Sequence, residues 1–194
     1  MEIILASGSP RRREILQGVG ATFKIMISDA EEIIDASLPP YFTAEKLSLL
    51  KASDIASKLS AEGKEAVVIG ADTIVVKDGE ILTKPKDKDD AIRMLTLLSG
   101  KSHEVITGVT VIDTKTAKSE SFYESTKVYF KKLTEDEILA YTETTEPYDK
   151  AGSYAIQGKG ALLIEKIEGD YFNVVGLPVC RLSCVLKEEF NIKL

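Results

Sequence analysis

The chain has 194 residues, enough for one domain with a sizeable core, and its 44% hydrophobic and 29% charged content is ordinary for a globular protein. Because 31 acidic residues outnumber 25 basic ones, the net charge of −6 excludes a broad basic surface for nonspecific nucleic-acid binding. No apolar run approaches the roughly 20 residues of a membrane span, and the start does not resemble a signal peptide, so we expect a cytoplasmic protein without a membrane partner.

The chain contains two cysteines, Cys180 and Cys184, and a single histidine, His103. These residues cannot complete a zinc site, and the two cysteines do not indicate a disulfide framework. We expect both cysteines to pack in the core and His103 to lie at a strand end rather than act as a catalyst. The chemistry must therefore depend on carboxylates, lysines, arginines and a metal that prefers oxygen ligands.

The N-terminal residues predict a strand, a turn and a helix. Residues 3–5 are a short apolar run, Ser7-Gly8-Ser9 is typical of a turn, and Ser9-Pro10 predicts a helix N-cap and first helical residue. Residues 11–13 are arginines, although cations at a helix N-terminus cost about 0.3–1 kcal/mol each. Either they are solvated surface charges, or a bound phosphate removes the conflict through hydroxyls, guanidinium groups and backbone N–H groups.

A second strand is predicted over residues 22–27, followed by an acidic segment that contains Glu31 and Glu32. The acidic segment is either a solvated loop or a source of carboxylate ligands for a divalent cation beside a phosphate. Thr43 predicts the cap of a helix that runs to about residue 60 and has Lys51 in its apolar stripe. The Lys51 ammonium group either reaches solvent or points at a bound anion.

Residues 65–76 are a nearly continuous β-branched run, which predicts a central strand covered on both faces. Asp72 interrupts this run, and a buried carboxylate must be paired, bound to metal or placed at a strand end facing a cleft. Asp78-Gly79 predicts a hairpin turn into residues 80–83. Because this hairpin reverses the chain, Lys84 at its end is expected to add a cation on the same side as Asp72.

The remaining elements follow in order. Asp87 or Asp89 starts a helix that ends before Gly100, and residues 103–113 and 121–133 alternate as paired strands. Residues 134–137 form a capping box for a short helix, and residues 161–167 and 171–175 read as a hairpin. A final helix follows Gly176-Leu177-Pro178 and runs to about residue 190.

Residues 146–158 combine polar groups, glycines and an aromatic without helical or strand periodicity, a composition typical of binding loops. Gln157 carries both a hydrogen-bond donor and an acceptor, so it can read the edge of a base.

Six motifs occur in order along the chain: Ser7-Gly8-Ser9-Pro10-Arg11-Arg12, Gly70-Ala71-Asp72-Thr73, Lys84-Pro85, Ser99-Gly100-Lys101-Ser102-His103, Glu146-Pro147-Tyr148-Asp149-Lys150-Ala151-Gly152 and Asn173-Val174-Val175-Gly176-Leu177-Pro178. Each is weak alone, but together they resemble the Maf family of nucleoside triphosphate pyrophosphatases over nearly the whole chain. The segment with Lys150 and Gln157 is similar to the dTTP/UTP-specific branch rather than to the branch that prefers 7-methyl-GTP.

The resemblance implies one Maf-like domain over residues 1–194 with an α/β fold of the inosine-triphosphatase-like type. That fold is a bent mixed β-sheet flanked by helices, with two lobes around a cleft. The implied activity is a hydrolase reaction of nucleotide metabolism: cleavage of the α–β phosphoanhydride of dTTP, UTP and modified pyrimidine nucleotides, a house-cleaning activity. The implied cofactor is a divalent metal cation, Mg²⁺ or Mn²⁺.

The resemblance also assigns roles to residues. The family's proton acceptor matches Asp72, and an acidic residue implicated in catalysis or metal binding matches Glu32. Residues that contact the triphosphate match Ser7, Arg11, Arg12, Lys51 and Lys84. Residues that go with substrate choice match Arg11, Thr73 and Gln157. Whether Asp72 is a general base or a metal ligand, and whether Glu31 or Glu32 serves the metal, stay open here.

Two other functions compete with the enzyme. The family's association with septum formation and cell division suggests a nucleotide-sensing regulatory protein without turnover, but Asp72 and the acidic pair are both retained. A nucleic-acid-binding module that uses residues 11–13 is disfavoured by the net charge and by the lack of an aromatic-basic surface pattern. We therefore expect a nucleoside triphosphate substrate and no stable nucleic-acid partner. A homodimer is left open.

Overall fold

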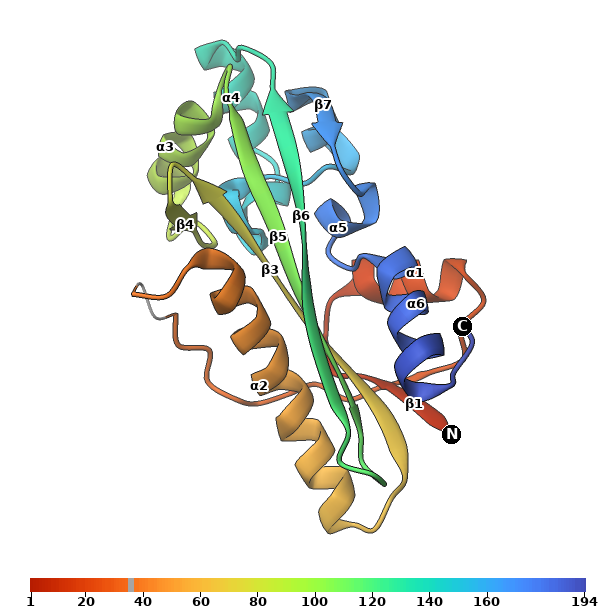
Figure 1. Ribbon diagram of the computed structural model, residues 1–194. Coiled ribbons are helices and arrows are strands. Elements are labelled where there is room, and N and C mark those ends of the chain that lie inside the picture. Colours follow the sequence, from red (N-terminus) through yellow and green to blue (C-terminus); the bar gives the residue numbers. More distant parts are fainter. Residues whose placement is uncertain (35–36) are drawn as a thin grey trace. The chain divides into compact units, whose positions relative to one another are not determined.

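The computed structural model describes residues 1–34 and 37–194, in which strands and helices alternate along the chain (Figure 1). The strands are β1 (Glu2–Leu5), β2 (Lys24–Ile25), β3 (Ala66–Lys77), β4 (Glu80–Leu82), β5 (Ser102–Asp113), β6 (Ser119–Phe130) and β7 (Ile164–Glu168). The α-helices are α1 (Pro10–Gly18), α2 (Pro40–Ala61), α3 (Lys88–Leu98), α4 (Glu135–Thr142), α5 (Tyr171–Val175) and α6 (Val179–Phe190). Three short 3₁₀ helices are η1 (Glu146–Asp149), η2 (Ala151–Ser153) and η3 (Gly158–Leu163).

Among the described residues, seven strands form one sheet in the order β2-β1-β3-β5-β6-β7, and β4 pairs with β3. Strand β1 is parallel to both β2 and β3. Strand β4 is antiparallel to β3, and β7 is antiparallel to β6. The predicted α/β class with an open mixed sheet flanked by helices is confirmed.

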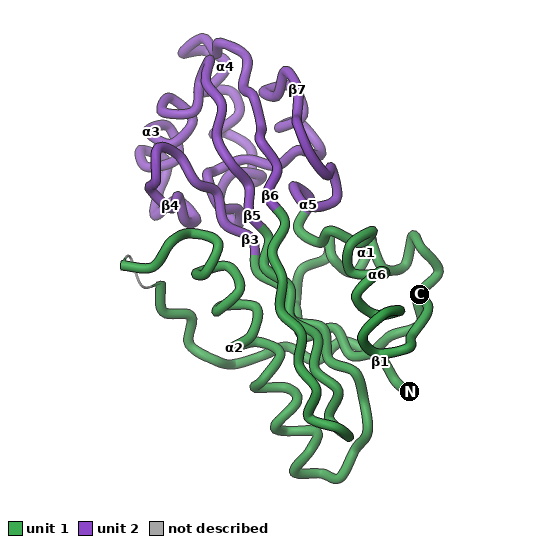
Figure 2. The backbone as a smooth tube through the Cα atoms, in the orientation of Figure 1, with its two compact units in different colours: residues 1–72, 107–124, 176–194 green, residues 73–106, 125–175 purple. Residues whose placement is uncertain are grey.

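The chain divides into two compact units (Figure 2). Unit 1 comprises Met1–Asp72, Thr107–Glu124 and Gly176–Leu194. Unit 2 comprises Thr73–Ile106 and Ser125–Val175. The long strands β3, β5 and β6 each contribute residues to both units, and each unit has its own hydrophobic core.

In unit 1, helix α2 lies along one side of the strands and α6 lies on the other side (Figure 1). Two glycines bring the strands close to α2. A Cβ atom at Gly70 would lie 2.4 Å from the carbonyl oxygen of Ser48, and one at Gly108 would lie 2.2 Å from that of Ala44. Because both obstacles are helix backbone, glycine is required at these two crossings.

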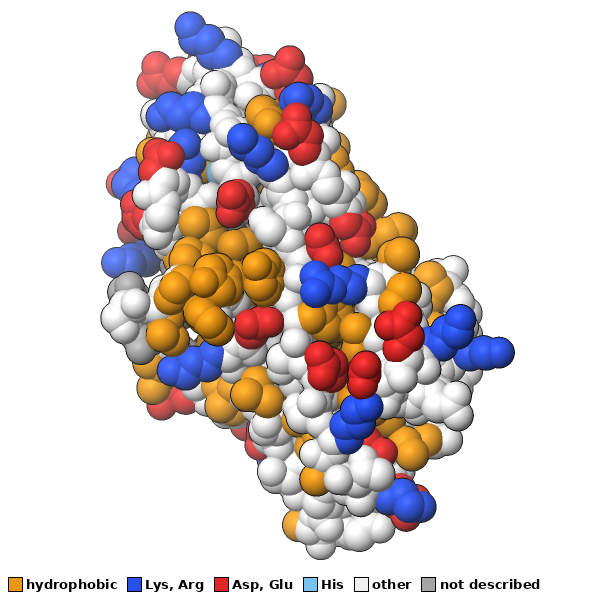
Figure 3. Space-filling view, in the orientation of Figure 1, with side chains coloured by type: hydrophobic (Ala, Val, Ile, Leu, Met, Phe, Trp, Pro, Cys, Tyr) orange, Lys and Arg blue, Asp and Glu red, His pale blue; other side chains and the backbone are white. Residues whose placement is uncertain are grey.

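Part of the α2 surface remains apolar and exposed. Tyr41 and Phe42 pack against each other near the start of the helix, and the Tyr41 ring lies 5.2 Å from that of Tyr123 on β6. Figure 3 shows hydrophobic side chains gathered over this end of α2. Of the helices in the described residues, not one combines the length and apolar character that a membrane span requires.

Unit 2 contains an apolar core of its own. Its members come from β3, β4, α3, β5, β6, α4 and the residues after α4, and include Leu95, Leu98 and Val128. Of the two predicted helix starts, Asp87 and Asp89, the structure shows Asp87, whose carboxylate accepts a hydrogen bond from the backbone N–H of Asp90. The capping box of Thr134 and Glu137 is also present.

Several local predictions were wrong. Helix α2 begins at Pro40 rather than after Thr43, because a proline at the first position needs no N–H partner. Residues 171–175 form helix α5 rather than a strand, since the Asp170 carboxylate accepts the backbone N–H of Phe172 and starts a turn. β7 instead pairs with β6.

The cysteine prediction was also wrong. Cys180 and Cys184 are both exposed, because the buried stripe of α6 consists of Val179, Leu182 and Leu186. His103 lies near the start of β5, as predicted, and only 3% of its surface is exposed. Its Nε2 atom lies 2.6 Å from the hydroxyl of Tyr154.

We predict that Gly70→Ala destabilises the protein by about 1–3 kcal/mol, because the added methyl group meets the α2 backbone and has no room. The matched control is Gly18→Ala, where the new Cβ meets nothing within 4 Å. Urea unfolding monitored by circular dichroism measures both. Equal midpoints for the two variants would show that α2 can move away from the strand at little cost.

A second prediction concerns acid stability. Burial lowers the pKa of His103 from 6.5 to about 4, and Lys77 adds to the lowering. Because the unfolded chain binds this proton at higher pH than the folded chain, stability present above pH 6.5 is lost as the pH falls towards 4. Between pH 7 and 5, the wild type should lose roughly 2 kcal/mol more than His103→Gln. Parallel losses in urea unfolding would contradict the burial of a neutral His103.

Candidate active site

The first site element is the turn between β1 and α1. Strand β1 ends at Leu5, and the chain passes through Ser7 and Ser9 into a helix whose first residue is Pro10. Ser9 is the N-cap residue, but its hydroxyl makes no capping bond within the part of the chain that the structure describes. Instead the Ser7 hydroxyl accepts the backbone N–H of Ser9 at 3.3 Å. The predicted strand, turn and helix are confirmed, with Ser7 rather than Ser9 closing the turn.

The three arginines of α1 have different surroundings. Arg12 is only 8% exposed, whereas Arg11 is half-buried and Arg13 is exposed. The Arg12 Nε donates to the carbonyl of Gly176 at 2.8 Å. Its Nη1 donates to the Ser7 hydroxyl at 3.0 Å and to the carbonyl of Ala71 at 2.8 Å. Arg12 therefore ties the β1–α1 turn to β3 and to Gly176 in the segment between α5 and α6.

Arg12 brings a positive charge into a poorly solvated part of unit 1. Burial lowers the pKa of Arg12 from its ordinary value, Asp72 acts in the opposite direction, and Arg11 and Glu32 make smaller contributions of opposite sign. A guanidinium group nevertheless remains charged in proteins. The electrostatic influence of Asp72 on Arg12 places the acid predicted in β3 near this cation.

The second site element is a lysine between two carboxylates. Lys51 projects from α2, and its Nζ lies 2.5 Å from Asp72 Oδ1 and 2.9 Å from Glu32 Oε1. The side chains of Lys51 and Asp72 are 14% and 13% exposed, so water screens their attraction weakly. Of the alternatives predicted for Asp72, the structure shows a paired carboxylate, and Lys51 faces the sheet as its position in the apolar stripe indicates.

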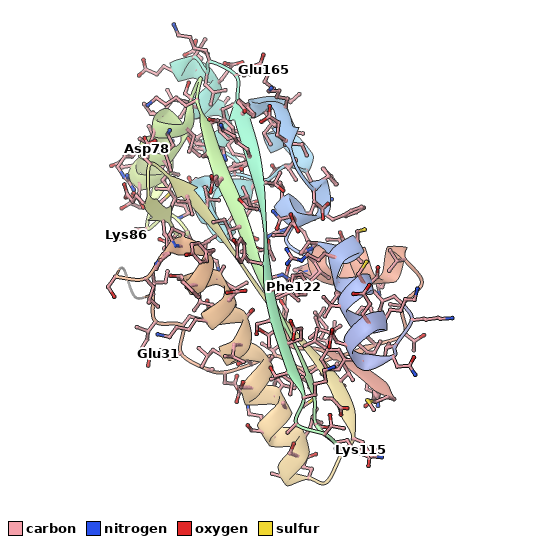
Figure 4. All side chains as sticks on the ribbon, viewed as in Figure 1. Glu31, Asp78, Lys86, Lys115, Phe122 and Glu165 are labelled. Atoms are coloured by element: carbon pink, nitrogen blue, oxygen red, sulfur yellow. The ribbon has the colours of Figure 1, made fainter. Side chains whose placement is uncertain are left out.

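Glu32 belongs to the loop after β2, and contacts between this loop and α2 bring the Glu32 carboxylate to Lys51. The backbone N–H of Asp29 donates to the Asp54 carboxylate at 3.1 Å, and Lys58 contacts both aspartates. Lys51, Asp54 and Lys58 are three, four and seven residues apart and lie on one side of α2. The ion pair with Lys51 belongs to Glu32, while the neighbouring Glu31 is exposed on the same loop (Figure 4).

The arrangement combines Arg12, in the helix that follows the carboxyl end of β1, and Lys51 with an acid in the middle of β3, three residues past the last β3 residue that pairs with β1. The region beyond the carboxyl end of a parallel strand is the usual place for ligands in α/β sheets. Arg12, Lys51 and the start of α1 suit an anion with several oxygens. Two carboxylates that already share one ammonium group are hard oxygen donors, and Mg²⁺ is commonly held by one or two carboxylates together with substrate phosphates. The residues therefore fit a divalent cation.

The three other predicted site residues belong to unit 2. Thr73 follows Asp72 in β3 and is half-buried. Lys84 is exposed, two residues after β4. Gln157 is exposed immediately before η3. The structure thus brings Ser7, Arg12, Lys51, Asp72 and Glu32 together within unit 1, with Arg11 beside Arg12 in α1.

Two site groups were not predicted, namely the carbonyl groups of Ala71 and Gly176 that hold Arg12. Backbone acceptors carry no sequence signal of their own. Both residues do lie inside motifs noted in the sequence, Ala71 next to Asp72 and Gly176 two residues before Pro178, and that proximity was the available clue.

Comparison with known proteins agrees with these motifs. The family model described as Maf-like protein matches residues 2–189. A dTTP/UTP pyrophosphatase of Thermoanaerobacter sp. (strain X514) is 52% identical, and the alignment covers 100% of both chains. Proteins of the same name from Alkaliphilus oremlandii and Acetivibrio thermocellus are each 54% identical, over 100% and 97% of this chain and 98% and 95% of theirs.

One solved structure is a nucleoside-triphosphatase / dITP/XTP pyrophosphatase from Mycobacterium abscessus. It is 10% identical, with a TM-score of 0.40 over 98% of this chain and 94% of that chain. This likeness is too low to add to the sequence relationships above.

We predict that Arg12→Lys costs roughly 1–3 kcal/mol of stability, because one ammonium group cannot serve three acceptors that meet a planar guanidinium. Arg13→Lys is the matched control, one residue further along α1 and exposed. Urea unfolding of both variants measures the difference. An Arg12→Lys midpoint equal to that of Arg13→Lys would contradict the structural role given to the guanidinium.

Proposed function

The chain belongs to the Maf family, and we propose that it hydrolyses the α–β phosphoanhydride of pyrimidine nucleoside triphosphates, releasing a nucleoside monophosphate and pyrophosphate. The proposed substrates are dTTP, UTP and modified pyrimidine nucleotides. The observation that carries the proposal is the charged cluster of unit 1, in which Lys51 joins the largely buried Asp72 and the more exposed Glu32 near Arg12. The names of the full-length relatives support the reaction and the bases.

In the proposed reaction, the phosphate chain binds the turn before α1 and the adjoining cations. Ser7, Arg11, Arg12 and Lys51 contact its oxygens, and the family resemblance adds Lys84 to the phosphate-binding residues. Positively charged groups fixed before the reaction stabilise the charge that develops on phosphoryl oxygens. Because Arg12 is already held by Ser7, Ala71 and Gly176, it needs no reorganisation when the substrate arrives.

Asp72 is the proposed proton acceptor. A water molecule adds to phosphorus at the α–β anhydride, its proton passes to the Asp72 carboxylate, and the bridging P–O bond breaks. Lys51, 2.5 Å from Asp72 Oδ1, keeps a positive charge beside this carboxylate. Glu32 and Asp72 would hold Mg²⁺ or Mn²⁺, which supplies charge neutralisation to the phosphates when bound.

Base choice is assigned to Arg11, Thr73 and Gln157. An amide side chain offers one acceptor and two donors, which match the N3–H and carbonyl groups of uracil and thymine. A site that pairs such groups rejects a base that leaves them unpaired. Adenine and guanine nucleotides are therefore expected to be poor substrates.

We predict that incubation with dTTP or UTP and Mg²⁺ or Mn²⁺ yields a monophosphate and pyrophosphate, with ATP and GTP largely spared. Anion-exchange chromatography of the nucleotides and a pyrophosphate assay identify the products. Release of orthophosphate and a nucleoside diphosphate would show that another bond is cleaved. Thermal stabilisation by the nucleotides without any turnover would instead indicate a nucleotide sensor.

We predict that Asp72→Asn lowers kcat by roughly 10²–10⁴-fold, since the amide cannot accept the proton. The same change at Asp78, an exposed turn residue of unit 2 (Figure 4), is the control and should leave kcat unchanged. Steady-state kinetics with UTP, alongside circular dichroism to verify folding, measures both. A folded Asp72→Asn protein with wild-type kcat would exclude Asp72 as proton acceptor.

A further inference from the structure

The loop around Gln157 is closed at its base. Gly160 packs so tightly that a Cβ atom there would lie 2.2 Å from the carbonyl oxygen of Ala155 and 2.8 Å from the hydroxyl of Tyr141. Ala155 and Gly160 are therefore adjacent in space, and the four residues between them form a short loop. Gln157 is exposed on this loop, whereas Gly160 is buried. We call residues 155–160 the Gln157 loop.

A single carboxylate from outside the loop holds its second half. Glu146, the first residue of η1, accepts the backbone N–H of Lys159 through Oε1 at 3.0 Å and that of Gly160 through Oε2 at 3.1 Å. These N–H groups belong to the first turn of η3. Glu146 thus satisfies two donors that a helix start leaves without partners inside the helix.

The first half of the loop is held through Tyr141 in α4. The Tyr141 hydroxyl accepts the backbone N–H of Ala155 at 3.3 Å and is hydrogen-bonded to the Glu146 carboxylate. The two halves of the Gln157 loop are thus connected through one tyrosine and one glutamate. Gly158, at φ 67°, leaves the space that this carboxylate occupies, since a Cβ there would lie 2.6 Å from Glu146 Oε1.

The residues that flank this network are also fixed. The Lys150 ammonium group donates to the backbone carbonyl of Glu146 at 2.8 Å. Tyr154, which directly precedes the loop, is buried, and its hydroxyl is hydrogen-bonded to Nε2 of His103 at 2.6 Å. Burial acts to raise the pKa of Glu146, but hydrogen bonds from Lys159, Gly160 and Tyr141, with the charge of Lys150, lower it overall. Glu146 therefore acts as a carboxylate acceptor at neutral pH.

We propose that Glu146 is a positioning residue for base selection, which fixes the Gln157 loop through Lys159, Gly160 and Tyr141 so that Gln157 meets the base in one orientation. This inference rests on the proposed role of Gln157 as a base-reading residue. Glu146 itself touches no reacting atom. Its effect should appear in discrimination between bases, because small displacements of a recognition group weaken contacts that require defined geometry.

The carboxylate is needed because it faces only donors. Both oxygens accept backbone N–H groups, and the Tyr141 hydroxyl is a third partner. In Glu146→Gln, the amide nitrogen would face an N–H donor, so one end of the loop would lose its partner. The substitution changes neither volume nor any apolar contact. It therefore tests the hydrogen bonds rather than the core.

The test compares kcat/KM for UTP with that for CTP in Glu146→Gln, Gln157→Ala and the double variant. Glu143→Gln is the control, since Glu143 is exposed nearby and pairs with Lys88 rather than with the loop. We expect Glu146→Gln to lower the UTP/CTP ratio roughly tenfold, mainly through the KM for UTP. Because Glu146 acts through Gln157, the double variant should be no less selective than Gln157→Ala. Hydrogen exchange at residues 155–160 should become faster in Glu146→Gln alone among the folded single variants.

Two outcomes overturn the inference alone. One is wild-type selectivity in Glu146→Gln beside an impaired Gln157→Ala, and the other is additive losses in the double variant. Wild-type selectivity in Gln157→Ala overturns the proposed role of Gln157, and the inference falls with it. Should Glu146→Gln fail to fold, Tyr141→Phe keeps the carboxylate and its two N–H partners, and the inference then requires a smaller loss of selectivity in the same direction.

Discussion

The buried guanidinium of Arg12 is the interaction on which the unit 1 site depends. Hydrogen bonds from this guanidinium connect the turn after β1, strand β3 and the segment between α5 and α6, which are distant in sequence. A buried charge is costly unless it is fully paired, so these three segments are fixed relative to one another within unit 1. The same charge faces the acid in β3. The Arg12 side chain therefore both holds these segments together and carries a positive charge next to Asp72.

Lys51 has a corresponding role on the α2 side of the site. It holds Asp72 and Glu32 together, although each carboxylate would repel the other. Glycines at positions 70 and 108 let α2 approach the strands closely enough for this contact. The packing of small residues in the sheet thus determines where this cluster of charges can lie. In unit 2, the Glu146 carboxylate holds the Gln157 loop through the backbone N–H groups of Lys159 and Gly160.

Local patterns predicted much of this structure. The β1–α1 turn, the Asp78-Gly79 hairpin, the Asp87 cap and the inward Lys51 follow from neighbouring residues alone. The burial of Arg12 instead of Arg11 or Arg13 could not be predicted, since its partners are the carbonyls of Ala71 and Gly176. The choice of Glu32 over Glu31 likewise depends on how the loop after β2 aligns with Asp54 and Lys58. Helix α5 could have been predicted from the sequence, because Asp170 can start a helical turn at residues 171–175.

The central claim is that the unit 1 cluster holds the phosphate chain. The most direct measurement is a titration of the ¹⁵N-labelled protein with a non-hydrolysable α,β-imido analogue of UTP and Mg²⁺, followed by amide resonances. We predict that the amide resonances of Ser7, Arg11, Arg12 and Asp72 shift together with one dissociation constant. Saturable binding that leaves all of these resonances in place would contradict it.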